Sequence, residues 1–305
     1  MDISVVVPTL NGRDLLAASL DSLAEHAPDA EVIVVNGPSA DGTTGMVRDR
    51  EDVDVLVEIS ARNVNVARNA GIEIADGDAV ALLGYDHRVE ADWLDTVADA
   101  LVDGADAVTG PLRRTVKGGA TSEAVERRRI VGREVTYVNG RNAAFRADLL
   151  SKLDGFDEYL ETGGSRDVSH RLAGMDVEVA WRPGMAVRRE APTAADGGRT
   201  EHDWGWKYRA LAYRLVKNYG VRPTVARRTL AHAVSDGRGA LREVTRGEAT
   251  PTSWIGNGRD VLTGIATGAS DGLVARASDR SSTRNPHGLS VRADRAVAKY
   301  DWREP

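Results

Sequence analysis

Polar residues that could do chemistry follow an apolar run in the first third of the sequence. The run, Ala79 to Leu83, is short and uninterrupted, which is typical of a strand buried on both faces of a parallel sheet. It leads into Asp86, His87 and Arg88. Because ligands of open α/β sheets bind outside the carboxyl ends of the strands, Asp86 and His87 could hold a metal ion and Arg88 could contact a phosphate. A solvated turn after a strand would carry the same residue types.

Four apolar runs in the first 90 residues predict strands, and each ends in polar residues. One such strand end is a weak signal, whereas four of them in order form a specific pattern. We therefore expect a ligand site at this edge of the sheet. The polar residues are Thr9 and Asn11 after the first run, Asn36 to Asp41 after the second, Arg62 and Arg68 after the third, and Asp86 after the fourth.

Helices between these strands would hold the strand ends in place. Leu16, Leu20 and Leu23 lie on one face of a helix predicted to begin near Asp14. Strands that alternate with helices of this length indicate βαβ units and a mostly parallel sheet. Further helices are predicted over 65–75, 93–101, 149–156 and 168–172, and further strands over 105–109, 135–138 and 177–181.

The last hundred residues have a different pattern. Helices are predicted over 204–219 and 223–234, and a third helical segment over 254–276 is interrupted by four glycines. The tail from Ser278 onward is polar and rich in arginine. We therefore expect a helical extension followed by a polar tail.

Composition excludes several classes of protein. The absence of cysteine excludes disulfides and thiolate metal sites. The N-terminus lacks the basic segment of a signal peptide, and no apolar run approaches the roughly 20 residues of a membrane-spanning helix. We therefore expect a cytoplasmic protein. Arginine far outnumbers lysine, which is typical of proteins from salt-adapted archaea and equally of proteins from GC-rich genomes.

Charge is divided unevenly along the chain. Residues 1–110 hold 22 acidic and 6 basic residues, a net charge of −16, whereas residues 111–305 hold 24 acidic and 34 basic residues, a net charge of +10. A basic second half predicts an anionic partner for that half. The arginines are scattered and form no known nucleic-acid-binding module, so nucleic acid is not the expected partner.

Together, these motifs resemble those of the family 2 glycosyltransferases over roughly residues 1–190. In the first half the similarity lies in Val-Val-Val-Pro8-Thr-Leu-Asn11, Val-Val-Asn36-Gly-Pro-Ser-Ala-Asp41-Gly-Thr43, Ala67-Arg-Asn-Ala-Gly71, Ala75-Asp-Gly-Asp78 and the apolar run to Asp86. In the second half it lies in Gly140-Arg-Asn-Ala-Ala-Phe-Arg146, Leu153-Asp-Gly-Phe-Asp157-Glu158 and Asp167-Val-Ser-His-Arg171-Leu172.

The resemblance implies an α/β protein with the GT-A nucleotide-sugar-binding fold, a mostly parallel central sheet and a C-terminal helical extension. It implies an inverting enzyme that moves a sugar from a nucleotide-sugar donor to an acceptor. The expected domains are a catalytic domain over 1–200, a helical extension over 201–277 and a polar tail over 278–305. Within the catalytic domain, 1–110 would bind the donor and 111–200 the acceptor.

The resemblance also assigns donor-binding roles. Asn36 replaces an Asp that reads the base in the family, and its amide offers a different set of donors. Asp41 could equally cap the following helix, and Arg68 could equally be a surface residue. The implied donor-binding residues are Thr9, Asn11, Asn36, Asp41, Arg68 and Asp86.

A divalent metal, Mg²⁺ or Mn²⁺, is the implied cofactor. Asp86 matches the second Asp of the family's Asp-x-Asp motif, but Gly84 occupies the first position. One carboxylate together with diphosphate oxygens and water can still hold Mg²⁺. His202 is a second candidate metal ligand, although a lone histidine in a loop is more often without such a role.

The catalytic base is harder to place. Only Asp167 remains as a carboxylate in the stretch where the family carries its acidic motif. Because inverting transfer needs one carboxylate to deprotonate the acceptor hydroxyl, Asp167 is the predicted base. It could instead cap a helix, in which case Asp157, Glu158 or Glu161 would have to serve.

Aromatic and basic residues alternate over 204–219. This pattern is typical of a helix that lies at a membrane surface. It also fits a helix packed on the catalytic domain with its basic face in solvent. The first interpretation predicts peripheral contact with the inner face of the cell membrane and a lipid-linked or glycan acceptor. The resemblance is to archaeal enzymes that build lipid-linked glycans for protein N-glycosylation.

The alternative is a non-catalytic nucleotide-sugar-binding protein, because Gly84, Asn36 and the altered acidic motif depart from the family.

Overall fold

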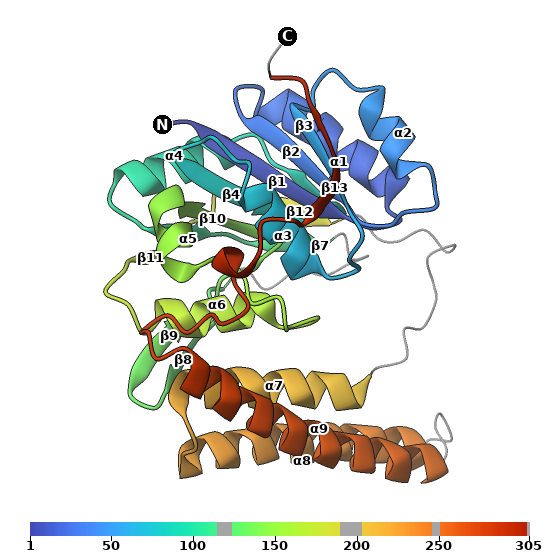
Figure 1. The fold of residues 1–305 in the computed structure, drawn as a ribbon, viewed down its shortest axis with the longest axis vertical. Coiled ribbons are helices and arrows are strands. Elements are labelled where there is room, and N and C mark those ends of the chain that lie inside the picture. The colour runs from blue at the N-terminus through green and yellow to red at the C-terminus, as the bar shows by residue number, and fades with distance from the viewer. Residues whose placement is uncertain (115–123, 190–202, 246–250, 304–305) are drawn as a thin grey trace.

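The computed structural model describes residues 1–114, 124–189, 203–245 and 251–303, without the side chains of 114, 239–245 and 251–257. A sheet of eight strands forms the centre of this part of the chain (Figure 1). β1 pairs in parallel with β2 and β4, and β2 pairs in parallel with β3. The strand order is β11 (Val179–Trp181), β6 (Ala107–Thr109), β10 (Asn142–Arg146), β4 (Ala79–Leu83), β1 (Ile3–Thr9), β2 (Glu31–Asn36), β3 (Val55–Ile59) and β13 (Ala296–Asp301).

Helices cover both faces of the sheet, because its central strands are apolar on both sides. One face packs against α1 (Arg13–His26), α2 (Thr43–Arg48) and α4 (Trp93–Val102), and the other against α3 (Val64–Ile72), α5 (Ala147–Leu153) and α6 (Gly164–Leu172). Leu16, Leu20 and Leu23 are buried on one face of α1, as the periodicity predicts. The prediction of a mostly parallel α/β sheet is confirmed.

Smaller sheets lie beyond the polar edge of the main sheet. β5 (His87–Val89), β12 (Val187–Arg189) and β7 (Leu112–Arg114) form one of them, and the hairpin of β8 (Arg127–Ile130) and β9 (Arg133–Thr136) forms another. Because β5 begins at His87, the residues after β4 do not form a free solvated turn. They are fixed between two sheets.

A layer of helices lies beneath the main sheet and the helices that cover it (Figure 1). It consists of α7 (Trp204–Tyr219), α8 (Pro223–Thr245) and α9 (Pro251–Ser278). Tyr208, Tyr213 and Tyr219 of α7 are buried against α6, the β8–β9 hairpin and the other two helices. The structure therefore agrees with the packed interpretation of α7 and not with the membrane-surface one. Among the helices described, none is long and apolar enough to cross a membrane.

Two features of the C-terminal third differ from the sequence-based expectation. α9 is continuous through its glycines. Gly268 lies so close to α7 that a Cβ there would overlap the carbonyl oxygen of Arg209. The tail is not a separate polar segment either. After a short 3₁₀ helix, η2 (Leu289–Val291), it returns to the main sheet, where β13 pairs antiparallel with β3.

Candidate active site

A cleft with a volume of about 480 Å³ opens at the carboxyl ends of the parallel strands. Thr9 ends β1, Gly37 follows β2, Arg62 follows β3 and Asp86 follows β4, and all four line the cleft. The far wall comes from two later segments, Asn139 to Arg141 before β10 and Glu161 to Ser165 at the start of α6. These four strand ends therefore line one cleft, and binding of a ligand there stays a prediction.

Two polar groups in the cleft wall lack partners. The hydroxyl of Thr9 and the Nε of Arg68 are buried, and neither finds a hydrogen-bond partner among the described residues. Because a buried polar group without a partner costs free energy, both are suited to bind a ligand that enters the cleft. Thr9 and Arg68 were predicted to contact the donor.

Arg68 is held rigidly although no carboxylate pairs with it in the described part of the chain. Its guanidinium donates to the Oδ1 of Asn65 at 2.9 Å and to the carbonyl of Gly140 at 2.9 Å. Burial, together with the nearby charge of Arg141, lowers the pKa of Arg68 to about 10. Arg62 and Arg141 also line the cleft, so an anionic ligand would meet three cations.

Three predicted donor-binding residues, Asn11, Asn36 and Asp41, lie beside the cleft and do not line it. The Oδ1 of Asn11 accepts from the backbone N–H of Ala40 at 2.8 Å. Asn36 is buried, donates to Thr44 at 3.0 Å and accepts from Ser39 at 2.7 Å. These contacts fasten together the loops that follow β1 and β2. Direct donor contact by either residue stays a prediction.

Asp41 lies one residue before Gly42, the N-cap of α2, and its carboxylate bonds to backbone N–H groups at the starts of two helices. It accepts from the backbone N–H of Arg13 at 3.0 Å and from the N–H of Thr43 at 3.2 Å, next to the starts of α1 and α2. Burial acts to raise the pKa of Asp41, but the hydrogen bonds from Thr43 and Arg13 outweigh burial and lower it. The geometry agrees with the capping alternative.

Asp86 reaches the cleft from the end of β4. Its Oδ1 lies 2.7 Å from the Nδ1 of His87, and its Oδ2 lies 2.7 Å from the Nε of Arg189 on β12. Burial acts to raise the pKa of Asp86, but the hydrogen bond from His87 and the charges of His87 and Arg189 lower it to about 2. Asp86 is therefore ionised at neutral pH.

The residues at this point fit a divalent cation held through one carboxylate. Gly84 cannot be replaced by a larger residue without rearrangement, since a Cβ there would lie 2.8 Å from the Nδ1 of His87 and 3.0 Å from the Cβ of Arg141. No group of three or more His, Asp or Glu side chains suited to a metal occurs among the described residues. Asp86 alone would then anchor a Mg²⁺ whose other ligands are diphosphate oxygens and water. The second predicted metal ligand, His202, lies outside the described residues.

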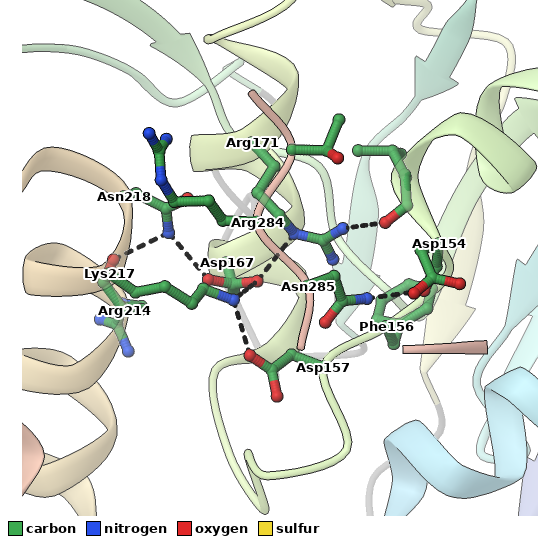
Figure 2. A network of polar contacts seen from close by, with 12 residues as sticks. Asp154, Phe156, Asp157, Asp167, Arg171, Arg214, Lys217, Asn218, Arg284 and Asn285 are labelled. Atoms are coloured by element: carbon green, nitrogen blue, oxygen red, sulfur yellow. Dashed lines mark hydrogen bonds and ion pairs between the residues drawn. The ribbon is translucent and has the colours of Figure 1, made fainter. Parts of the chain in front are cut away.

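Asp167, the predicted base, does not line the cleft. It is fully buried in α6, and Figure 2 shows Lys217 of α7 reaching between Asp167 and Asp157. The Nζ of Lys217 lies 2.8 Å from Asp167 and 2.6 Å from Asp157, and the Nε of Arg171 lies 2.9 Å from Asp167. Burial acts to raise the pKa of Asp167, but the charges of Lys217 and Arg171 lower it to about 2.

Of the three alternative bases, only Glu161 faces the cleft. Asp157 is buried and accepts from Lys217 and from the hydroxyl of Tyr213 at 2.8 Å. Glu158 is paired with Arg292 at 3.0 Å. Glu161 is exposed and, together with Asp86, is one of two carboxylates that line the cleft. Sequence reasoning left Glu161 as one of three equal alternatives, because only the fold shows which of them has access to a ligand.

Comparison with known proteins settles the family. The model of the family described as glycosyl transferase family 2 matches residues 4–157, which is half of the chain. The chain belongs to glycosyltransferase family 2. It is a glycosyltransferase that takes its sugar from a nucleotide-sugar donor, and the matched residues include the strand ends that line the cleft.

Relatives of this family 2 glycosyltransferase include two proteins of Haloferax volcanii. One is a glucosyl-dolichyl phosphate glucuronosyltransferase, 24% identical over 67% of this chain and 72% of its own length. The other is the glycosyltransferase AglE, 25% identical over 53% of this chain and 58% of its own length.

Solved structures show that the fold extends beyond the family match. The mannosyltransferase PcManGT of Pyrobaculum calidifontis, in complex with GDP-Man and Mn²⁺, superposes with a TM-score of 0.55 at 20% identity over 92% of this chain and 88% of its own. TarS of S. aureus, in complex with UDP-GlcNAc, superposes with a TM-score of 0.62 at 18% identity over 93% of this chain and 90% of its own. The predicted GT-A fold with C-terminal helices is confirmed.

Proposed function

We propose that this glycosyltransferase is an inverting enzyme with a metal-assisted donor site, and that its acceptor is a glycan carried on a lipid phosphate. One observation carries the proposal. The cleft at the strand ends combines three cations, the unpartnered Thr9 hydroxyl and two carboxylates in different environments. Such a set suits a diphosphate leaving group on one side and proton removal from an acceptor on the other.

Each residue would have one part in the reaction. Arg68, held by Asn65 and Gly140, binds the donor diphosphate, with Arg62 and Arg141 at the rim. Asp86 would hold Mg²⁺ or Mn²⁺, which supplies positive charge to the departing nucleoside diphosphate. Glu161 accepts the proton of the acceptor hydroxyl as that oxygen attacks the anomeric carbon from the side opposite the diphosphate.

Asp167 is a less suitable base in this arrangement. Its carboxylate is closed off from the cleft, and both of its oxygens are already bonded to Lys217, Arg171 or Asn218. A carboxylate with a pKa near 2 is also a weak proton acceptor at neutral pH. We therefore propose Glu161 as the base and a structural role for Asp167.

The relatives support the lipid-linked acceptor and the pathway. A relative that acts on glucosyl-dolichyl phosphate suggests a phosphate-linked glycan as the acceptor class. Assembly of a glycan for surface proteins is the proposed setting. The basic second half of the chain agrees with an acceptor that carries negative charge.

We also propose peripheral contact with an anionic membrane surface, through α8 and not through α7. Leu230 and Val234 of α8 are 54% and 52% exposed on one face, and Arg227 and Arg238 lie one turn to either side. Apolar and basic residues on the same helix face are typical of a helix that lies at an anionic lipid surface.

A transfer assay tests the proposed function. Nucleotide sugars are supplied with Mg²⁺ or Mn²⁺ and with a short-chain polyprenyl phosphate that carries a sugar, and the anomeric configuration of the product is determined. We expect one donor to give a lipid-linked product of inverted configuration, and we expect the Asp86→Ala variant to give none. Transfer with retained configuration, or full activity of Asp86→Ala, would contradict the proposal.

A further inference from the structure

A second cavity, of about 720 Å³, lies directly behind the acceptor side of the cleft. It is bounded by the start of α6, by the β8–β9 hairpin and by α7 and α8. Thr162 and Gly163 line both cavities, so a single stretch of backbone separates them. A molecule whose reacting hydroxyl is near Glu161 could therefore extend past this loop into the second cavity.

Cations outnumber carboxylates in this second cavity. Among its described lining residues are five cationic side chains and two carboxylates. Both carboxylates are already engaged. Glu126 lies 2.7 Å from Arg166 and 3.8 Å from Arg128, and Asp236 lies 2.7 Å from both Lys207 and the hydroxyl of Tyr208. The five cations are Arg128, Arg166, Lys207, Arg214 and Arg228.

Two of these cations, Arg214 and Arg228, have no carboxylate within ion-pair distance in the described part of the chain. Arg214 comes from α7, one turn before Lys217 (Figure 2). Its Nε is buried without a hydrogen-bond partner among the described residues. Burial, together with the charge of Arg166, lowers the pKa of Arg214 to about 10. A buried guanidinium nitrogen without a partner is costly, and a bound anion would remove that cost.

Arg214 also touches the loop that separates the two cavities. A Cβ at Gly163 would lie 2.6 Å from its Nη1, so the guanidinium lies directly against that backbone. Gly163 has a φ of +79°, a conformation that glycine adopts without strain. An anion bound by Arg214 would therefore lie one residue layer away from the acceptor side of the donor cleft.

We propose that this second cavity binds the phosphate group of the acceptor. Guanidinium groups from α7 and α8, pointing at one cavity, suit the several oxygens of a phosphate or diphosphate. Leu211, Leu215 and Ala231 supply an apolar wall, which suits an alkyl chain attached to that phosphate. The inference rests on the proposed function, because it requires an acceptor that carries a phosphate.

Binding of inorganic phosphate tests the cavity itself. The titrations contain a saturating nucleoside diphosphate, so that phosphate cannot bind in the donor cleft. Calorimetry then measures phosphate binding by the wild type and by the variants Arg214→Gln, Arg228→Gln and Arg238→Gln. Arg238 is exposed on α8 and does not line the cavity, so its variant is the control. Phosphate affinity should fall about 10- to 100-fold in Arg214→Gln and Arg228→Gln, because each loses one charge-assisted hydrogen bond. It should stay unchanged in Arg238→Gln. Melting temperatures check that each variant is folded.

Transfer kinetics then test the acceptor. The Michaelis constant for a polyprenyl phosphate sugar should rise about 10-fold or more in Arg214→Gln, with donor affinity unchanged. A sugar 1-phosphate without lipid is compared, and equal use of both acceptors would assign the phosphate to a soluble glycan. Unchanged phosphate affinity in Arg214→Gln and Arg228→Gln, or no phosphate binding by the wild type, would overturn the inference. Phosphate binding that depends on both arginines, without any transfer to lipid-linked sugar, would instead contradict the proposed function.

Discussion

Two carboxylates in one cleft have opposite surroundings, which separates their chemistry. Asp86 is buried between His87 and Arg189, and its lowered pKa of about 2 keeps it charged and able to hold a cation. Glu161 is exposed, and no ion pair ties it to another described residue. A carboxylate that is free to meet the acceptor is the one suited to accept a proton.

Replacement of Glu161 by Gln keeps the shape of the side chain and removes the base. We expect kcat to fall by about 10²–10⁴, the usual contribution of general-base catalysis, with the dissociation constant of the donor nearly unchanged. Single-turnover transfer rates and donor titrations separate the two quantities. If kcat stays at the wild-type value, another group must accept the proton.

Asp167→Asn should act on stability and not on chemistry. Loss of a carboxylate that is paired with two buried cations should lower the free energy of unfolding by about 3–5 kcal/mol at neutral pH. Folding lowers the pKa of Asp167 from 3.8 to about 2, so its stabilising contribution is present above pH 3.8 and is lost as the pH falls toward 2. The difference between wild type and variant should therefore shrink over that range.

Denaturant titrations between pH 2 and 7 measure this difference, and the activity of the folded fraction is measured beside them. Normal stability together with a loss of kcat would restore Asp167 as the base.

The sequence could place Thr9 and Asp86 at strand ends and Arg68 in the helix after the third strand, because that inference needs only local patterns. It could not show that Asp167 is enclosed, because its partner Lys217 lies 50 residues away in the chain.

At the scale of elements, α9 depends on close contact with α7. Gly264, Gly268 and Gly272 lie at intervals of four residues and face the backbone of α7. Repeated glycines in the sequence predicted interruptions of the helix, because an isolated glycine weakens a helix. In the structure the same residues allow two helix backbones to approach, which is a tertiary effect that periodicity does not reveal.

Gly268→Ala should destabilise the helical layer although alanine favours helices. The added methyl would overlap the backbone of Arg209, and the cost of such overpacking is about 1–3 kcal/mol. Gly258→Ala on the same helix is the matched control, since nothing lies within 4 Å of a Cβ there. That control should be neutral or stabilising by up to about 1 kcal/mol. Equal effects of the two changes in thermal unfolding would contradict this account of the packing.

Two strands of the main sheet, β10 and β13, were also outside the reach of sequence patterns. β10 follows a turn at Asn139 to Arg141 and was not separated from the loop before it, since its alternation is weak. β13 lies in an Arg-rich tail, and its exposed, polar residues give no apolar signal. Its pairing with β3 is set by tertiary contacts such as those of the buried Arg295 with Glu73 and Glu158.

At the scale of the whole molecule, the division of charge has a structural counterpart. The acidic first 110 residues supply five of the eight strands of the main sheet and the strand ends that line the cleft. The basic second half supplies Arg141, most of the second cavity and the outer face of α8. The tail then returns from the helical layer to the sheet edge, so both halves are part of one fold (Figure 1). The basic residues of the second cavity and of the outer face of α8 are those to which we propose that the anionic acceptor and the membrane bind.

The outer face of α8 gives a test of membrane contact. The double change Leu230→Glu and Val234→Glu should reduce binding to vesicles that contain anionic lipid, because both side chains are more than half exposed and neither supports the core. Sedimentation with vesicles at low salt measures the bound fraction. High salt screens the charges of Arg227 and Arg238 and should weaken binding as well. No binding of the wild type to such vesicles would contradict the proposed contact.

The most direct test of the whole account is donor binding to the cleft, with Arg68 as the probe. The Arg68→Met variant keeps the volume of a buried, unpaired cation and removes the group proposed to bind the diphosphate. Calorimetric titration with the nucleotide sugar that the wild type uses should give a dissociation constant raised about 10- to 100-fold, which corresponds to the loss of one charge-assisted hydrogen bond. Melting temperatures check that the variant is folded at the temperature of the titration. An unchanged dissociation constant in folded Arg68→Met would contradict the assignment of this cleft as the donor site.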